Sequence, residues 1–136
     1  MKVNELNLKP PALDFLKSEG LTELYPPQAD CVSAGLFDEK KSFLVSIPTA
    51  SGKTLIAMLA ILSHISNHKT KVVYLSPLRA LASEKFEEVK KLEALDLGRK
   101  IKVAISTGDS NSSDNKLDDA DVIILTNETM DANIAF

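Results

Sequence analysis

The sequence has a single cysteine, no tryptophan, no long apolar run and no excess of basic residues. Cys31 alone cannot form an internal disulfide, which fits a reducing compartment. A membrane-spanning helix needs about 18 or more mostly apolar residues, and no run reaches that length. The first residues, MKVNELNLKPP, also lack the apolar centre of a signal peptide. We therefore expect a cytoplasmic protein that does not enter a membrane.

The acidic balance limits how the chain can hold a nucleic acid. Its formal net charge is −3 over 136 residues. Proteins that bind DNA or RNA by bulk electrostatics are usually basic, because lysine and arginine neutralise the phosphates. Any nucleic-acid contact is therefore expected to be local. The length suits one domain, and the 44% of hydrophobic residues can supply a core.

Apolar runs and helical patterns alternate along the chain. Helical stripes and proline or glycine punctuation predict helices over residues 11–21, 24–37, 54–66 and 78–95, the last with an apolar stripe of Leu78, Leu81, Phe86, Val89 and Leu92. Continuous apolar runs predict strands over residues 42–47, 71–77, 100–107 and 122–126. Alternation of apolar strands with helices indicates parallel strands covered on both faces. We expect an α/β fold, a three-layer sandwich in one domain.

The stretch SIPTASGKT, Ser46 to Thr54, nearly matches a phosphate-binding loop. The strict pattern is G-x-x-x-x-G-K-[ST], and its first glycine would fall on Ile47. The loop follows the apolar run SFLVSI and opens the predicted helix, which is the context that the motif requires. In that context Lys53 would meet terminal phosphates, and the hydroxyl of Thr54 would hold Mg²⁺. A plain strand–turn–helix is the alternative.

Five stretches in order resemble the motifs of superfamily 2 helicases. PTASGKT is similar to their motif I, whose loops often lack the first glycine, and LYPPQ resembles their Q motif. SPLRALASEK resembles motif Ia, and STGD and TNE look like two later motifs that contact the strand. These stretches run from about Tyr25 to the end of the chain. The resemblance is greatest to archaeal DNA-repair helicases akin to the helicase part of DNA polymerase theta.

The resemblance implies an incomplete RecA-like domain of the DEAD/DEAH type that binds ATP and Mg²⁺. It also implies a parent enzyme that unwinds DNA, rather than RNA, in the 3′ to 5′ direction. Gln28 would read the adenine edge. The implied nucleotide-binding residues are Gln28, Thr49, Ala50, Ser51, Gly52, Lys53 and Thr54, with Lys53 and Thr54 as the catalytic pair. The implied nucleic-acid contacts are Arg79, Thr107, Gly108 and Thr126.

The residues themselves agree with these roles. Arg79, Thr107 and Thr126 each follow a predicted strand, and ligands bind at the carboxyl edge of open α/β sheets. Hydroxyls, arginines and loop N–H groups are typical phosphate contacts. The alternatives are a surface helix charge for Arg79 and capping hydroxyls for both threonines. For Gln28 the alternative is a solvated helix residue.

One part of an ATPase has no counterpart in this sequence. Hydrolysis needs an acidic pair directly after a buried strand, to hold Mg²⁺ and position water. The acidic run DDAD, Asp118 to Asp121, precedes its strand and so belongs to the opposite edge of the sheet. We therefore expect residues 1–136 to be the N-terminal part of the domain, cut before the acidic motif and inactive in ATP turnover. An apolar strand edge left open by that cut would promote self-association.

Rival functions explain fewer residues. NKLD, Asn115 to Asp118, fits a guanine-reading pattern, but a polar loop precedes it and no D-x-x-G occurs. A small-molecule P-loop kinase would leave LYPPQ and SPLRALASEK unexplained. A nucleotide-binding module without catalysis, or part of an RNA helicase, stays open. His64 and His68 have the i, i+4 spacing of metal ligands, but no third ligand accompanies them, so a pair facing solvent is expected.

Overall fold

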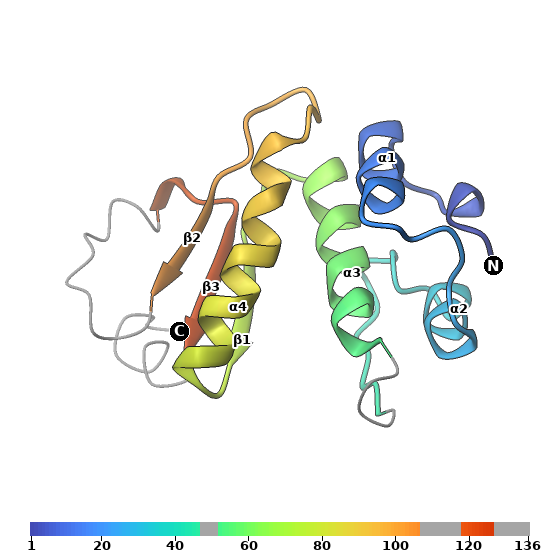
Figure 1. Cartoon of the computed structure of the whole chain (residues 1–136), viewed down its shortest axis with the longest axis horizontal. Helices are drawn as coiled ribbons and strands as arrows, with labels where there is room; N and C mark the ends of the chain where they lie inside the picture. The colour runs from blue at the N-terminus through green and yellow to red at the C-terminus, as the bar shows by residue number, and fades with distance from the viewer. Residues whose placement is uncertain (47–51, 107–117, 127–136) are drawn as a thin grey trace. The chain divides into compact units, whose positions relative to one another are not determined.

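The computed structural model divides the chain into two units, Met1–His68 and Lys69–Phe136. Residues 1–46, 52–106 and 118–126 are described. Among them, no helix is both long and apolar enough to cross a bilayer. The units are named below as the N-terminal unit and the C-terminal unit, and their elements are labelled in Figure 1.

The N-terminal unit is helical. A short 3-10 turn, η1 (Val3–Glu5), precedes the helices α1 (Pro10–Ser18), α2 (Pro26–Ser33) and α3 (Lys53–Asn67). Prolines stand in the first turn of α1 and α2, where the N–H that proline lacks would have no partner in the helix. The chain leaves α1 through Gly20 at φ +82°, and Leu21 N donates to Leu16 O over 3.0 Å. The predicted helices over 11–21, 24–37 and 54–66 are thereby confirmed, with the second one shorter than expected.

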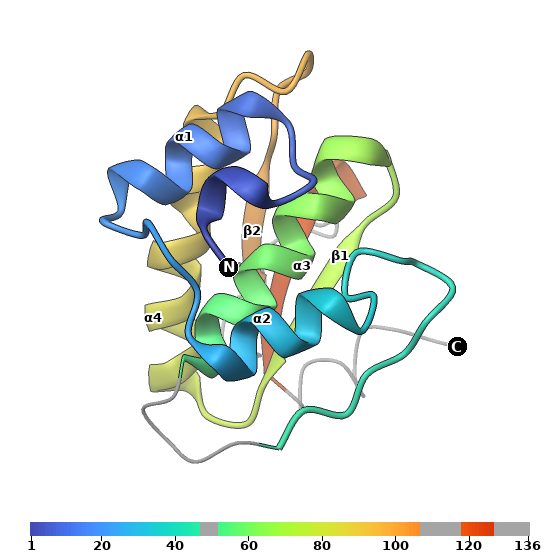
Figure 2. The ribbon, with the colours of Figure 1, turned by 90° about the vertical axis from the view of Figure 1, so that its right-hand side faces the viewer.

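Apolar residues hold the N-terminal unit together. Val3, Leu6, Ala12, Leu16 and Leu24 are all buried, and α1 contacts η1. The longest helix, α3, buries residues on more than one side, as its nearly continuous apolar sequence predicted. α2 contacts α3, and both views of the ribbon show the two helices side by side (Figures 1 and 2). That contact joins the two segments that carry the candidate nucleotide residues.

The C-terminal unit contains a parallel sheet of three strands. They are β1 (Val72–Ser76), β2 (Val103–Ser106) and β3 (Val122–Thr126), in the order β1-β3-β2. In this register Val122 pairs with both Val72 and Val103. All residues of the central strand β3 are buried, whereas in β1 half-buried and exposed residues alternate from Val72 to Leu75 and only Ser76 is buried. The α/β class and three of the four predicted strands are confirmed.

One helix covers the sheet within this unit. α4 (Arg79–Lys90) contacts all three strands, continues into η2 (Lys91–Ala94), and lies along the sheet in Figure 1. The predicted apolar stripe is only partly correct, because Leu78 and Leu81 are exposed while Val89 and Leu92 are buried. Leu78 is still in an extended conformation as the N-cap, so helical spacing does not apply to it. Ala82, outside the predicted stripe, is buried instead.

The predicted strand over 42–47 is wrong for the residues that the structure describes. Residues 42–46 form no strand, Leu44 is 98% exposed, and Ile47 lies outside the described residues. A strand exists through hydrogen bonds to a neighbour, and apolar composition supplies no neighbour. In the described part of the N-terminal unit, the only strand-like pairing is an isolated bridge between Lys2 and Glu23.

Candidate nucleotide site and nucleic-acid edge

Gly52 starts the helix that carries the candidate phosphate-binding residues. It is the N-cap of α3, at φ +84° and ψ +31°, a left-handed conformation that L side chains rarely adopt. As a glycine, Gly52 has no side chain with which to cap the helix. The first N–H groups of a helix point outward and carry partial positive charge, so this end of α3 suits an anion.

The side chain of Gln28, on α2, contacts the backbone of Gly52. Its side-chain Nε2 donates to Gly52 O over 3.3 Å, and its Oε1 accepts from Tyr25 N over 2.8 Å. The residue is only 2% exposed, so the alternative of a solvated helix residue is wrong. A Cβ at Gly52 would stand 2.0 Å from Gln28 Nε2. Two residues far apart in sequence, both predicted for the nucleotide site, are therefore in direct contact.

Lys53 and Thr54 are the first two residues of α3, and both are exposed. An ammonium and a hydroxyl at the positive end of a helix fit the phosphates of a nucleotide and one coordination position of a magnesium ion. Magnesium usually keeps several waters and takes other ligands from the phosphates, so one hydroxyl from the chain fits its chemistry. The predicted residues Thr49, Ala50 and Ser51 lie outside the described residues.

The carboxyl ends of two neighbouring strands meet in the C-terminal unit. Ser76 ends β1 and pairs in register with Thr126, which ends β3. Arg79 begins α4 just beyond Ser76 and is exposed, as predicted for a residue at this edge. The hydroxyl of Ser76 donates to Leu78 O over 3.3 Å, which stabilises the turn into the helix. Sequence reasoning assigned this serine no separate role, although a hydroxyl at the end of a predicted strand was the available signal.

Thr126 and Arg79 differ in how accessible they are. The side chain of Thr126 is buried in the structure. Thr107 and Gly108 lie outside the described residues, and Ser106 just before them is also buried. Among the predicted nucleic-acid contacts that the structure describes, Arg79 is thus the accessible one.

The acidic run before β3 has a structural role. Asp121 accepts a hydrogen bond from Lys102 N at 2.9 Å through Oδ2 and forms an ion pair with Arg99 through Oδ1. Lys71 Nζ donates to the carbonyl oxygens of Asp118 and Ala120. These contacts hold the amino-terminal end of the sheet together.

The two histidines have a partner that the sequence did not indicate. Glu39 Oε1 lies 2.6 Å from His64 Nδ1 and 2.9 Å from His68 Nε2, and the two rings stack at 5.1 Å. His68 is exposed and His64 is half-buried, so the pair does reach solvent, and Glu39 is an additional partner. No group of His, Cys, Asp or Glu within the described ranges could hold a metal ion. No local pattern links Glu39 to α3, so spacing arguments could not have found this contact.

Comparison with known proteins places these features in a family. A family model described as DEAD/DEAH box helicase matches residues 25–135. The ATP-dependent DNA helicase Hel308 of Pyrococcus abyssi is 48% identical over 132 residues, which are 97% of this chain and 18% of that protein. The Hel308 of Methanocella arvoryzae is 44% identical over 133 residues, again 97% of this chain and 18% of the relative.

A solved structure agrees with these sequence relatives. The crystal structure of the DUF1998 helicase MrfA bound to DNA superimposes with a TM-score of 0.76 at 25% identity, covering 93% of this chain and 18% of MrfA. The chain thus spans about a fifth of the length of each of these relatives. Since the family model covers most of the chain, the chain belongs to the DEAD/DEAH box helicase family.

Proposed function

We propose that this chain is the ATP-binding part of an ATP-dependent DNA helicase of superfamily 2, acting in the 3′ to 5′ direction in DNA repair. The observation that carries the proposal is the contact between Gln28 and Gly52 beside the exposed Lys53. This contact brings Gln28 to the start of α3, where the ammonium of Lys53 also lies, and so supports a nucleotide site in this unit. The relatives named as DNA helicases support DNA over RNA.

Each residue has a defined part in this proposal. Lys53 would neutralise the β and γ phosphates, and Ala50, Ser51 and Gly52 would offer backbone N–H groups to them. Thr54 provides the ligand from this chain for Mg²⁺, which when bound neutralises charge that develops on the phosphates. In contacts among the described residues Gln28 uses one hydrogen and one lone pair of its amide, so the other hydrogen and lone pair could meet the adenine edge.

Strand contacts belong to the C-terminal unit in this proposal. Arg79 binds a phosphate of the nucleic acid, and Thr107, Gly108 and Thr126 are proposed to add hydroxyl and backbone contacts. Thr126 would have to become accessible for this role, because it is buried in the structure. ATP binding and hydrolysis in the parent enzyme would drive movement along the strand.

We propose that the 136 residues bind ATP without turning it over. No acidic pair directly follows a buried strand in this sequence, so the carboxylates that would help Thr54 hold Mg²⁺ and would position water are absent from it. Release of phosphate by the pure protein, lost in Lys53→Ala, would contradict this statement while leaving the binding proposal intact.

Titration with a fluorescent ATP analogue and Mg²⁺ tests the nucleotide site. We expect saturable binding that ATP displaces better than GTP. Lys53→Ala should weaken it roughly tenfold or more, because a charge-assisted contact is worth about 1.5–3 kcal/mol. Lys100→Ala, which removes an equally exposed lysine far along the sequence, is the matched control. Equal affinity of wild type and Lys53→Ala, with both folded by circular dichroism, would reject the proposed site.

A further inference from the structure

The N-terminal unit contains a cavity that the nucleotide proposal does not use. It lies between the segment after α2 and the C-terminal half of α3, and its volume is about 320 Å³. Pockets for small molecules begin at about this size. At about 1.5 Å per residue, Ser63 in its wall lies roughly 15 Å along α3 from Lys53. The cavity is therefore separate from the start of the helix.

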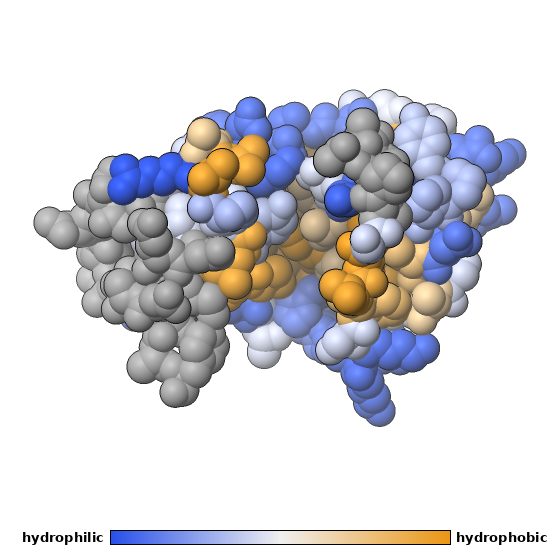
Figure 3. Space-filling view, turned by 90° about the horizontal axis from the view of Figure 1, so that it is seen from below, coloured by the Kyte–Doolittle hydropathy of each residue, from blue (hydrophilic) through white to orange (hydrophobic). Residues whose placement is uncertain are grey.

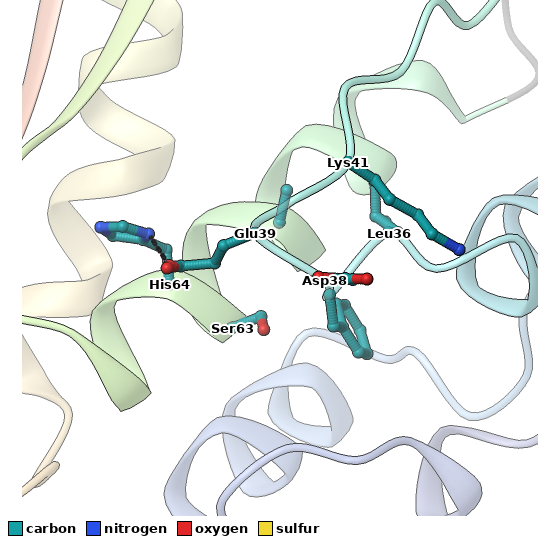
Figure 4. Close-up of a pocket in the computed structure, with 8 residues that line it drawn as sticks. Leu36, Asp38, Glu39, Lys41, Ser63 and His64 are labelled. Atoms are coloured by element: carbon teal, nitrogen blue, oxygen red, sulfur yellow. Dashed lines mark ion pairs between the residues drawn. The ribbon is translucent and has the colours of Figure 1, made fainter.

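Hydrogen bonds within the segment after α2 give the cavity a defined wall. Asp38 N donates to Gly35 O over 2.9 Å, and Lys41 N donates to Asp38 O over 3.1 Å. Asp38 Oδ1 accepts from Lys40 N at 3.0 Å. Glu39 reaches across to the histidines of α3, as Figure 4 shows for His64. These contacts anchor the segment at both sides of the cavity.

The charged groups of the wall are not equally available. The ammonium of Lys41 donates to Ala34 O over 3.3 Å at the end of α2, and Glu39 is occupied by His64 and His68. Asp38 uses only one of its two carboxylate oxygens in contacts among the described residues. Among the same residues, Glu39 also uses only one carboxylate oxygen, Oε1, and a hydrogen bond to a carbonyl leaves the positive charge of Lys41 in place. The wall therefore carries two carboxylates, Asp38 and Glu39, and one ammonium.

Ser63 adds a polar group on the opposite side. It is only 6% exposed, lines the cavity from α3, and in Figure 4 lies on the side of the helix that faces Asp38. Leu36, Phe37 and Ala60 supply apolar surface between the two polar groups.

We propose that this cavity binds a small alkylammonium ligand. The ammonium would donate to the free carboxylate oxygen of Asp38 and to the hydroxyl of Ser63, which accepts. An alkyl chain would pack on the apolar surface of Leu36, Phe37 and Ala60. An anion would meet the charge of Asp38, and a neutral alcohol would leave that carboxylate without a donor of matching charge.

Amide chemical shifts of the full chain, titrated with butylammonium chloride, test the proposal without any nucleotide. We expect saturable shifts at Phe37, Asp38 and Ser63, and much weaker responses to butyrate and to 1-butanol. Equal responses to all three probes, or none to butylammonium, would overturn it. The outcome does not depend on whether ATP binds, so this proposal and the proposed function can fail separately.

Two variants and one control variant test which groups bind the ammonium. Asp38→Asn keeps the oxygen that accepts from Lys40 N and removes the charge, so affinity should fall at least about tenfold. Ser63→Ala should weaken binding by roughly two- to tenfold. Asp30→Asn removes the same charge from an exposed position on α2 and should leave affinity unchanged. If Asp38→Asn and Asp30→Asn bind equally well, the carboxylate of Asp38 is not the receptor for the ammonium.

Discussion

At the scale of single residues, two independent features of the structure require a glycine at position 52. Its backbone is at φ +84°, and the space that a side chain would fill is taken by Gln28. The motif pattern alone accounts for a glycine here but does not say which neighbour excludes a side chain. The structure identifies that neighbour as the glutamine that sequence reasoning placed at the same site, so the two motif residues constrain each other.

Gly52→Ala is expected to destabilise the protein more than Gly20→Ala. Both glycines have nearly the same φ, +84° and +82°, but nothing lies within 4 Å of a Cβ built at Gly20. The shared backbone strain costs about 1–2 kcal/mol, and only Gly52→Ala adds a clash. Urea denaturation of both variants measures the difference. If both variants lose the same unfolding free energy, the side chain of Gln28 moves aside without a cost in stability.

A double-mutant cycle identifies the source of that difference. Gln28→Ala removes the atoms that a Cβ at Gly52 would meet, so Gly52→Ala should cost less in that background. A coupling free energy of about 0.5–3 kcal/mol is the expected range for residues in contact. A coupling near zero would contradict the close approach of the two residues.

Arg79 allows a test of the proposed nucleic-acid contact at the carboxyl ends of β1 and β3. Arg79→Ala should weaken the binding of single-stranded DNA at every sequence alike and reduce the slope of log K against log salt by about 0.7, because one phosphate contact is lost. Fluorescence anisotropy over a series of salt concentrations measures both quantities. Lys100→Ala, at another exposed position, serves as the control. If Arg79→Ala leaves the slope of log K against log salt unchanged, Arg79 does not contact a phosphate.

At the scale of elements, local signals predicted helices better than strands. Proline at the start and glycine at the end act within one turn, so α1 and α2 were predictable without knowledge of their surroundings. Three apolar runs became strands because each has a neighbour in the sheet. The run over 42–46 has an apolar centre, Phe43 to Val45, and yet forms no strand, because pairing is decided by contacts that no short stretch encodes.

The position of a strand in the sheet predicts how sensitive it is to substitution. Ile124→Ala in β3 removes a fully buried side chain from the central strand and should cost about 2–5 kcal/mol of unfolding free energy. Val73→Ala in β1, where the side chain is 43% exposed, should cost less than about 1 kcal/mol. Thermal or urea unfolding provides the comparison, and similar losses would argue against β3 as the central strand.

At the scale of the whole molecule, exposed apolar side chains deserve an explanation. Large apolar side chains are exposed on β1, at the start of α4 and in the segment that follows α2, and apolar surface is visible among hydrophilic surface in Figure 3. β1 is an edge strand whose Val73 and Leu75 are both exposed. An exposed apolar edge strand is a ready template for pairing with a second copy. We therefore propose that the protein associates with itself through β1.

Sedimentation velocity over a range of concentrations tests this association. Leu75→Lys should shift the protein toward the monomer, because a charge on an edge strand opposes pairing. Leu78→Lys makes the same change at a more exposed leucine outside the strand and should leave the association unchanged. A wild-type protein that stays monomeric at the highest concentration, or equal effects of both substitutions, would rule out β1 as the interface.

The sequence by itself determined the α/β class, the helix starts, the glycine–lysine–threonine loop and the family, because these depend on residues close together in the chain. Tertiary structure decided which apolar runs became strands, that Gln28 is buried on Gly52, that Thr126 is buried, and that Glu39 joins two histidines. Each of these features depends on a neighbour distant in sequence, and local patterns carry no information about that neighbour's position.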